Sequence, residues 1–490
     1  MAAKSNLIKQ PMFSLFLIIL LGIIVRLYFQ VGHVFSDDAY YSYLSYSLLY
    51  SNFGEDYLGY PVFPLRFTFI ALNSLSMMIF GINEFSTILF PFIVSILNIF
   101  LVYKLTLLIT KDKSTAISGS FLIAFFPTDI VFASLNFPDL INVFFINLGI
   151  YFLLKSYSQY KSALSYLGGF FLFFSMQIKE NVYFVLILLS ILFIYFLIKK
   201  KKLISQIFIG ITFILLNYFI EGLVYLFLND NFFYRITITN LNYQYSFYDF
   251  FPYTAQKISE SKNYLRNLFD QLIQINAKSV FVRRFYLFLP IVASVQTYLN
   301  IRKNKFALIN FWFWGTALLM ITFTTSFTEY KPLDLSRSWY IYPLLMPAII
   351  LSSIFLNKFS RNIKAGLIII YTLGSLIMCF EYQTFFNADN FDELKGFLRK
   401  NSSQMIYTDH FTKYSVDLIR NYESNNSERL LGNDFNFSQI RQKEWLLYNY
   451  KHIKELELQK YEFPDFSILK SNQFKQIASF NDFIFYEKLP

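Results

Sequence analysis

The chain has 490 residues, of which 55% are hydrophobic and only 15% are charged, with a formal net charge of +11 and a mean hydropathy of +0.41. This composition excludes an ordinary water-soluble globular protein, in which about 25% of residues are charged. The positive charge does not indicate a nucleic-acid-binding protein, because the Lys and Arg residues are spread over short loops.

Eleven apolar segments follow one another until about residue 382. A helix of roughly 20 apolar residues crosses a hydrocarbon core of about 30 Å, so we interpret each segment as a membrane span. The spans are 11–31, 85–108, 115–133, 140–156, 162–178, 182–198, 204–228, 280–299, 307–326, 339–357 and 365–382. The first is interpreted as a retained helix and not as a signal peptide, because it contains Arg26 and no small-residue cleavage site follows it.

The basic residues predict how the chain is threaded. If the N-terminus is cytoplasmic, every strong basic cluster falls in an inner loop, as the positive-inside rule requires. The clusters are Lys4 and Lys9; Lys111 and Lys113; Lys155 and Lys161; Lys199 to Lys202; Arg302, Lys303 and Lys305; and Lys358, Arg361 and Lys364. We therefore predict a multi-pass protein of the cell membrane with an extracytoplasmic C-terminus, and the enrichment in Ile, Lys, Asn, Phe and Tyr favours a prokaryotic source.

The threading divides the chain into two domains. Residues 1–384 form a helical membrane domain with two long outer loops, 32–84 and 229–279, and residues 385–490 form a small extracytoplasmic α/β domain. In that second domain we expect helices at Asp392 to Arg399 and near Ser415 to Tyr422, and strands at Met405 to Thr408 and Phe483 to Glu487.

One apolar segment, Arg66 to Phe80, does not fit as a span, because counting it would invert every later loop. We expect it to be an interfacial or partly inserted helix.

Ionisable side chains gather at four of the predicted outer turns. Each costs about 2.5 to 3.5 kcal/mol at the centre of a membrane helix, and less near the interface, so a cluster of them needs a reason. The residues are Asp37 and Asp38 with Tyr40, Asp139, Lys179 with Glu180, and Lys331 and Arg337 with Tyr340; Arg66 is the nearest cation in the first loop. Taken singly they are helix caps, a local ion pair or a snorkelling arginine. Taken together they predict a site.

In order and topology these motifs resemble the GT-C glycosyltransferases. The resemblance rests on the acidic pair after the first helix, the Asp at the outer start of the fourth, the Lys-Glu between the fifth and sixth, and the Arg-aromatic-Pro element entering a late helix. The most similar group is the protein O-mannosyltransferases and aminoarabinose transferases, family 39 and its relatives, over residues 10 to about 360. It implies transfer of a sugar from a polyprenyl-phosphate carrier to a lipid, glycan or protein acceptor outside the cytoplasm.

The charges then predict roles. An acceptor hydroxyl must lose its proton as it attacks the anomeric carbon, so we expect Asp37 to act as general base, with Asp38 and Asp139 beside it. The leaving phosphate needs cations, for which Arg337 is the first candidate and Lys331 and Lys179 follow. One base and one displacement predict inversion at the anomeric carbon.

Two departures from the family pattern bear on the site. Tyr60, not a basic residue, precedes Pro61 in the first outer loop, and the acidic pair is Asp-Asp where many members have Asp-Glu. A divalent metal between Asp37 and Asp139 is an open alternative. Two carboxylates without a histidine are a thin ligand set, so the sequence commits to no cofactor.

Two other classes of function stay open. A transporter or flippase for a lipid-linked or polar substrate also places charges between helices, but usually near the midplane of a repeated fold. A polysaccharide polymerase or ligase also uses lipid-linked sugars, but offers less reason for the acidic pair.

Overall fold

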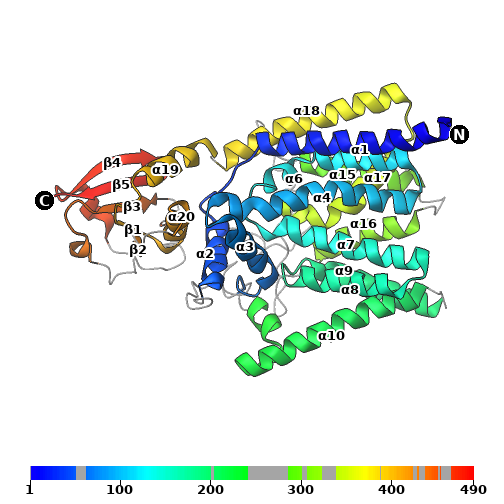
Figure 1. The fold of residues 1–490 in the computed structure, drawn as a ribbon, viewed down its shortest axis with the longest axis horizontal. Helices are drawn as coiled ribbons and strands as arrows, with labels where there is room; N and C mark the ends of the chain where they lie inside the picture. Colours follow the sequence, from blue (N-terminus) through cyan, green and yellow to red (C-terminus); the bar gives the residue numbers. More distant parts are fainter. Residues whose placement is uncertain are drawn as a thin grey trace, which may run out of the picture.

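The computed structural model describes residues 2–50, 62–199, 203–240, 285–300, 306–322, 338–386, 388–422, 427–429, 436–450, 453 and 465–490. Long helices lie side by side in a bundle, and a small domain with a β-sheet caps one end of it (Figure 1). The N-terminus lies at the opposite end of the bundle from that domain (Figure 1).

The bundle follows the apolar segments of the sequence, since each of the eleven predicted spans overlaps a described helix. Its helices are α1 (Ala2–Tyr28), α4 (Glu84–Thr110), α5 (Lys113–Ala124), α6 (Pro127–Phe132), α7 (Pro138–Gln159), α8 (Ser162–Met176), α9 (Val182–Ile198), α10 (Leu203–Asn229), α15 (Phe288–Asn300), α16 (Ala307–Thr322), α17 (Tyr342–Leu356) and α18 (Arg361–Phe385). Short 3-10 turns, η1 (Phe285–Leu287) and η2 (Ser338–Ile341), precede α15 and α17. The start of the predicted span 280–299 lies outside the described residues.

Six helices of the described chain are long and apolar enough to cross a membrane: Pro11–Tyr28, Glu84–Thr110, Pro138–Gln159, Ile204–Asn229, Ser338–Leu356 and Arg361–Phe385. Others are shorter apolar helices packed among them, such as Ser162–Met176 and Val182–Ile198. The protein is therefore a multi-pass membrane protein, and the number of its spans stays a prediction.

The third predicted span, 115–133, is divided into α5 and α6. Proline disfavours helical backbone in the residue before it, and Phe126 is accordingly extended, with φ −74° and ψ 117°. Pro127 then begins α6, where the missing N–H costs nothing. The break matters because it turns Asp129 of α6 into the bundle interior, where it is fully buried.

Helices α2 (Asp37–Leu49) and α3 (Phe67–Phe80) lie at the end of the bundle nearest the sheet domain, crosswise to the long helices (Figure 1). With 14 residues, α3 is about 21 Å long, too short to cross the hydrocarbon core. It ends at Gly81, whose φ of +80° suits glycine, and the Asn83 capping box then starts α4. The interfacial or partly inserted position expected for this helix stays a prediction.

The C-terminal domain is a five-stranded sheet in the order β2-β1-β3-β5-β4, with β2, β1 and β3 parallel and β5 and β4 antiparallel. Its elements are α19 (Ala388–Lys400), β1 (Ile406–Thr408), α20 (His410–Ile419), β2 (Ser427–Arg429), η3 (Phe437–Gln439), β3 (Trp445–Asn449), η4 (Phe466–Lys470), β4 (Phe474–Phe480) and β5 (Phe483–Lys488). The four elements predicted from the sequence are present. Helix α20 begins before the predicted Ser415, because the carboxylate of Asp409 accepts the N–H of Thr412 and caps an earlier start.

Candidate active site at the capped end of the bundle

The two adjacent carboxylates at the start of α2 have opposite environments. Asp38 is fully buried: it pairs with His33 Nδ1 at 2.6 Å and accepts the backbone N–H groups of Val34 and Ser36, each at 2.7 Å. Burial alone would raise the pKa of Asp38, but His33 and the two N–H groups outweigh it and hold that pKa below 3.8. Asp37 is exposed. The acidic pair therefore divides into a carboxylate that shapes the backbone and one that faces outward.

Tyr41 lies one turn after Asp37, on the same side of α2. Its buried hydroxyl accepts a hydrogen bond from Nη1 of Arg66, whose guanidinium also lies 5.2 Å from the Phe63 ring centre. Burial raises the pKa of Tyr41, Arg66 lowers it, and the charges of Asp37 and Asp139 raise it again, with a net rise. The hydroxyl therefore keeps its proton at neutral pH and lies within the electrostatic reach of both carboxylates.

Asp139, in the first turn of α7, pairs with Lys179 from the connection between α8 and α9. Lys179 Nζ lies 2.6 Å from Asp139 Oδ1 and 5.6 Å from the ring centre of Tyr340 in η2. One turn further along α7, the amide of Asn142 donates to the carbonyls of Ser175 and Lys179, at 2.7 and 2.9 Å. This ties the connection to α7 and holds the lysine against its carboxylate.

Glu180 connects the two groups of charges, because it follows Lys179 in the chain and lies 3.5 Å from Arg66 through its Oε2 atom. Its other oxygen, Oε1, is buried and accepts no hydrogen bond from the described part of the chain. Tyr40 is placed differently: its ring is fully buried against Phe63 and against Tyr414 of the C-terminal domain.

The structure thus brings six of the predicted residues to one end of the bundle: Asp37, Arg66, Asp139, Lys179, Glu180 and Tyr340. Asp38 and Tyr40 are fully buried at the same end: Asp38 bonds to the segment before α2, and Tyr40 packs against Phe63 and Tyr414. Lys331 and Arg337 lie outside the described residues, so their side chains stay predictions.

Three contributors to this region were not foreseen from the sequence. Neither Tyr41 nor His33 belongs to a sequence motif that would predict a functional site. The i, i+4 spacing from Asp37 to Tyr41 was nevertheless a usable signal, because it places both on one side of a helix. The third is Arg235, which is buried and donates to the carbonyl of Leu65 at 3.0 Å and to the side-chain oxygens of Gln177 and Glu221. It anchors the backbone that precedes Arg66.

A further buried ion pair lies inside the bundle, between Arg26 of α1 and Asp129 of α6, at 2.6 Å. Both side chains are fully buried, and Ser95 of α4 bonds to both. The pair and Ser95 thus join three helices. Because both charges are buried and paired with each other, we interpret them as structural and not as a substrate site.

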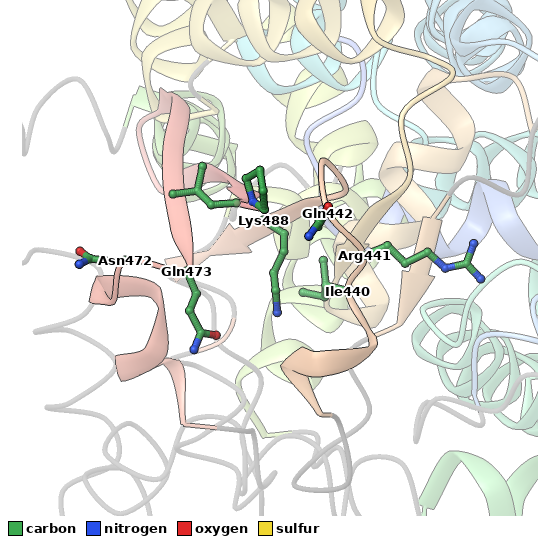
Figure 2. A pocket seen from close by; sticks show the side chains of 8 residues that line it. Ile440, Arg441, Gln442, Asn472, Gln473 and Lys488 are labelled. Atoms are coloured by element: carbon green, nitrogen blue, oxygen red, sulfur yellow. The ribbon is translucent and has the colours of Figure 1, made fainter.

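Within the described residues, no three His, Cys, Asp or Glu side chains group as a metal site requires. A surface hollow of about 670 Å³ lies in the C-terminal domain, lined by residues that include Arg441, Gln473 and Lys488 (Figure 2). Lys488 donates to the carbonyl of Phe437, and none of the predicted site residues lines this hollow.

Comparison with known proteins relates the chain to membrane glycosyltransferases. Residues 64–225 match the family model described as dolichyl-phosphate-mannose-protein mannosyltransferase. No curated protein matches the chain in sequence.

Solved structures share the fold. ArnT from Cupriavidus metallidurans in the apo state matches with a TM-score of 0.59 and 10% identity, over 99% of this chain and 98% of that one. The same protein bound to undecaprenyl phosphate matches with a TM-score of 0.57 and 11% identity, over 98% of both chains. The Archaeoglobus fulgidus oligosaccharyltransferase, in a complex with Zn and sulfate, matches with a TM-score of 0.51 and 14% identity, over 83% of this chain but only 61% of that longer protein.

At such low identities the structural matches establish the fold, and the family model adds a match in sequence over its own range. In fold along nearly its whole length, and in sequence over residues 64–225, the chain resembles the GT-C glycosyltransferases of the protein O-mannosyltransferase and aminoarabinose transferase group.

Proposed function

We propose that this protein is a membrane glycosyltransferase that moves a sugar from a polyprenyl-phosphate carrier to an acceptor on the extracytoplasmic side. The observation that carries the proposal is the cluster of carboxylates and cations at one end of an apolar bundle, where a lipid-linked donor can reach it. A fold shared with ArnT, which has been solved with undecaprenyl phosphate, supports the same type of donor.

Asp37 is proposed as the general base. It is the exposed carboxylate of the pair, whereas Asp38 and Asp139 are both buried. A carboxylate that an acceptor hydroxyl can approach takes its proton as the oxygen attacks the anomeric carbon. With a single base and direct displacement, the sugar is transferred with inversion.

Lys179 and Arg66 are proposed to stabilise the charge that develops on the leaving phosphate. Each already faces a carboxylate, so a bound phosphate must share or replace Asp139 or Glu180. Tyr340 contacts Lys179, and Arg337 precedes it by three residues, a chain length of at most about 11 Å. We propose Arg337 and Lys331, which precede Tyr340 in the sequence, as further cations for this phosphate.

The test is the substitution Asp37→Asn. The asparagine side chain has nearly the same size and polarity, but its amide cannot take the proton from the acceptor hydroxyl. The donor is first identified by mass spectrometry of the lipid that copurifies with the protein. Release of polyprenyl phosphate is then measured with that donor and a membrane extract as acceptor. We expect turnover to fall at least about 100-fold, as loss of a general base typically causes.

Asp465→Asn is the matched control, because Asp465 is an exposed capping carboxylate in the C-terminal domain and asparagine caps equally well. Near-normal turnover of Asp37→Asn with an unchanged melting temperature would remove Asp37 from the mechanism.

A further inference from the structure

The backbone immediately before Asp37 has an unusual conformation. Phe35 has φ +56°, a left-handed conformation that a bulky L residue rarely adopts. Such a conformation persists only where the surrounding contacts hold it. The residues that hold Phe35 therefore determine how α2, and with it Asp37, begins.

The ring of Phe35 lies 5.2 Å from that of His33 in the same segment, and its other ring contacts come from the C-terminal domain. It stacks on Phe391 of α19 at 5.0 Å and 18°, and lies 5.1 Å from Phe483 of β5. Phe483 belongs to the domain core together with Leu394 and Phe485, and Phe391 packs against that core. We call Phe391 and Phe483 the Phe35 socket.

A second contact fixes the same segment two residues earlier. Glu84, at the start of α4, accepts the backbone N–H of His33 at 2.7 Å and the ammonium of Lys395 of α19 at 2.6 Å, on the same oxygen. Its other oxygen lies 3.2 Å from Arg399. Gly32 has φ +75°, a conformation that suits glycine, and a Cβ there would lie 2.5 Å from that first oxygen, so another residue would be strained and would displace the carboxylate.

The C-terminal domain also packs against α2 through stacked tyrosine rings. Tyr43 stacks on Tyr414 of α20 at 4.2 Å, and Tyr46 stacks on Tyr422 at 4.1 Å with nearly parallel rings. The domain therefore contacts both the segment before Asp37 and the helix after it.

We infer that the C-terminal domain positions the base, and that Phe35 is the positioning residue through which it does so. This inference rests on the proposed function of Asp37. The ring in the Phe35 socket keeps the strained backbone in place; the strained backbone lets the N–H groups of Val34 and Ser36 reach Asp38, and Asp37 then starts α2 facing outward. The soluble domain is thereby a structural part of the site in the membrane domain.

The test compares Phe35→Ala and Phe35→Gly with Phe35→Tyr. Glycine accepts the positive φ but has no ring, so it separates the ring contact from the backbone strain. We expect Ala and Gly to lower kcat at least about tenfold, as a misplaced reacting group does, with KM changed less than about twofold, and Tyr to retain most of kcat.

Phe397→Ala is the matched control. Phe397 packs in the same domain core, against Trp445 and Phe485, but has no ring contact with Phe35. If Phe397→Ala lowers kcat as much as Phe35→Ala at equal loss of melting temperature, the effect is one of domain stability and the inference is overturned. An unchanged kcat in Phe35→Gly overturns it as well.

A second measurement does not depend on catalysis. The amides of His33, Val34 and Ser36 are bonded to Glu84 or Asp38, so their hydrogen exchange reports the conformation of the segment. We expect Phe35→Ala and Phe35→Gly to exchange there at least about tenfold faster than wild type, with the bundle helices unchanged. Unchanged exchange overturns the role of the socket. If the wild-type protein transfers no sugar, the proposed function is overturned instead. Hydrogen exchange then still tests whether the Phe35 socket holds the segment.

Discussion

At the capped end of the bundle, identical side chains differ in role because their burial and hydrogen-bond partners differ. Asp37 and Asp38 are identical in chemistry and adjacent in sequence, yet one is exposed and the other is enclosed by His33 and two backbone N–H groups. Replacing them tests different properties: Asp37 bears on turnover, whereas Asp38 bears on stability.

The Asp38 carboxylate predicts a pH dependence. Its pKa in the folded protein is below the ordinary 3.8, so its contribution to stability is complete above that value and is lost as the pH falls through the folded pKa. Asp38→Asn should cost about 3 to 5 kcal/mol at neutral pH, because it breaks a buried pair, and should weaken the dependence of the melting temperature on acid. Thermal unfolding of both proteins in detergent between pH 3 and 7 measures this. Parallel curves for the two proteins would contradict it.

The pair of Asp139 and Lys179 predicts non-additive substitutions. Lys179→Met leaves the buried carboxylate of Asp139 without its partner and should lower the melting temperature more than Asp139→Asn does. The double variant should regain much of that loss, since neither charge remains. Turnover should fall mildly in Asp139→Asn. It should fall further in the double variant, because Lys179, the proposed cation for the phosphate, is then missing. Additive melting temperatures would indicate that the two side chains do not interact.

At the scale of elements, polar contacts and small residues determine which helices meet. In the membrane, lipid tails are as apolar as side chains, so close packing and internal hydrogen bonds replace the hydrophobic effect between helices. Arg26, Ser95 and Asp129 join α1, α4 and α6 in this way. Between α7 and α8 the backbones themselves touch, at Gly149 and Gly168.

Gly149→Ala tests this close packing. The new Cβ would lie 2.9 Å from the carbonyl oxygen of Gly168 and 2.7 Å from a Leu172 side-chain carbon, so the helices must separate, at about 1 to 3 kcal/mol. Gly366→Ala in α18 is the matched control: nothing lies within 4 Å of its Cβ, and alanine should gain up to about 1 kcal/mol in a helix. Thermal unfolding should thus shift in opposite directions. A stabilised Gly149→Ala would mean that α7 and α8 are less closely packed than described.

At the scale of the whole molecule, the basic residues predict which loops lie on the same side of the membrane. Asn357, after α17, donates to Asp112, before α5, at 2.9 Å, so two predicted inner loops meet. Lys364 also bonds to Asn357. Helices α2 and α3 lie at the other end, next to the sheet domain (Figure 1).

We predict that this capped end is extracytoplasmic. With the buried Cys379 replaced, a cysteine at the exposed Ser402 should react with a membrane-impermeant maleimide in intact cells, and one at Lys199 should react only after permeabilisation. Protection of position 402 would overturn the orientation and with it the eleven-span count.

What the sequence determined by itself is the set of elements. Burial of an apolar helix in lipid depends on its own 20 or so residues, so segments such as 85–108 and 140–156 were predictable within a few residues, as were the C-terminal helix at Asp392 to Arg399 and the strand at Phe483 to Glu487. The break at Pro127 was missed because apolarity continues across it. The four outer turns were found because charge at an apolar boundary is costly wherever the chain goes afterwards.

Only the tertiary structure decided which of those charges meet. Lys179 could pair with Glu180 beside it, but packing of α7 against α8 brings it to Asp139, 40 residues away, and leaves Glu180 to Arg66, 114 residues away. Phe35 carried no signal, because its partners Phe391 and Phe483 lie more than 350 residues further along the chain. Pairings of this kind depend on how whole elements pack, and no local pattern of residue types records that packing.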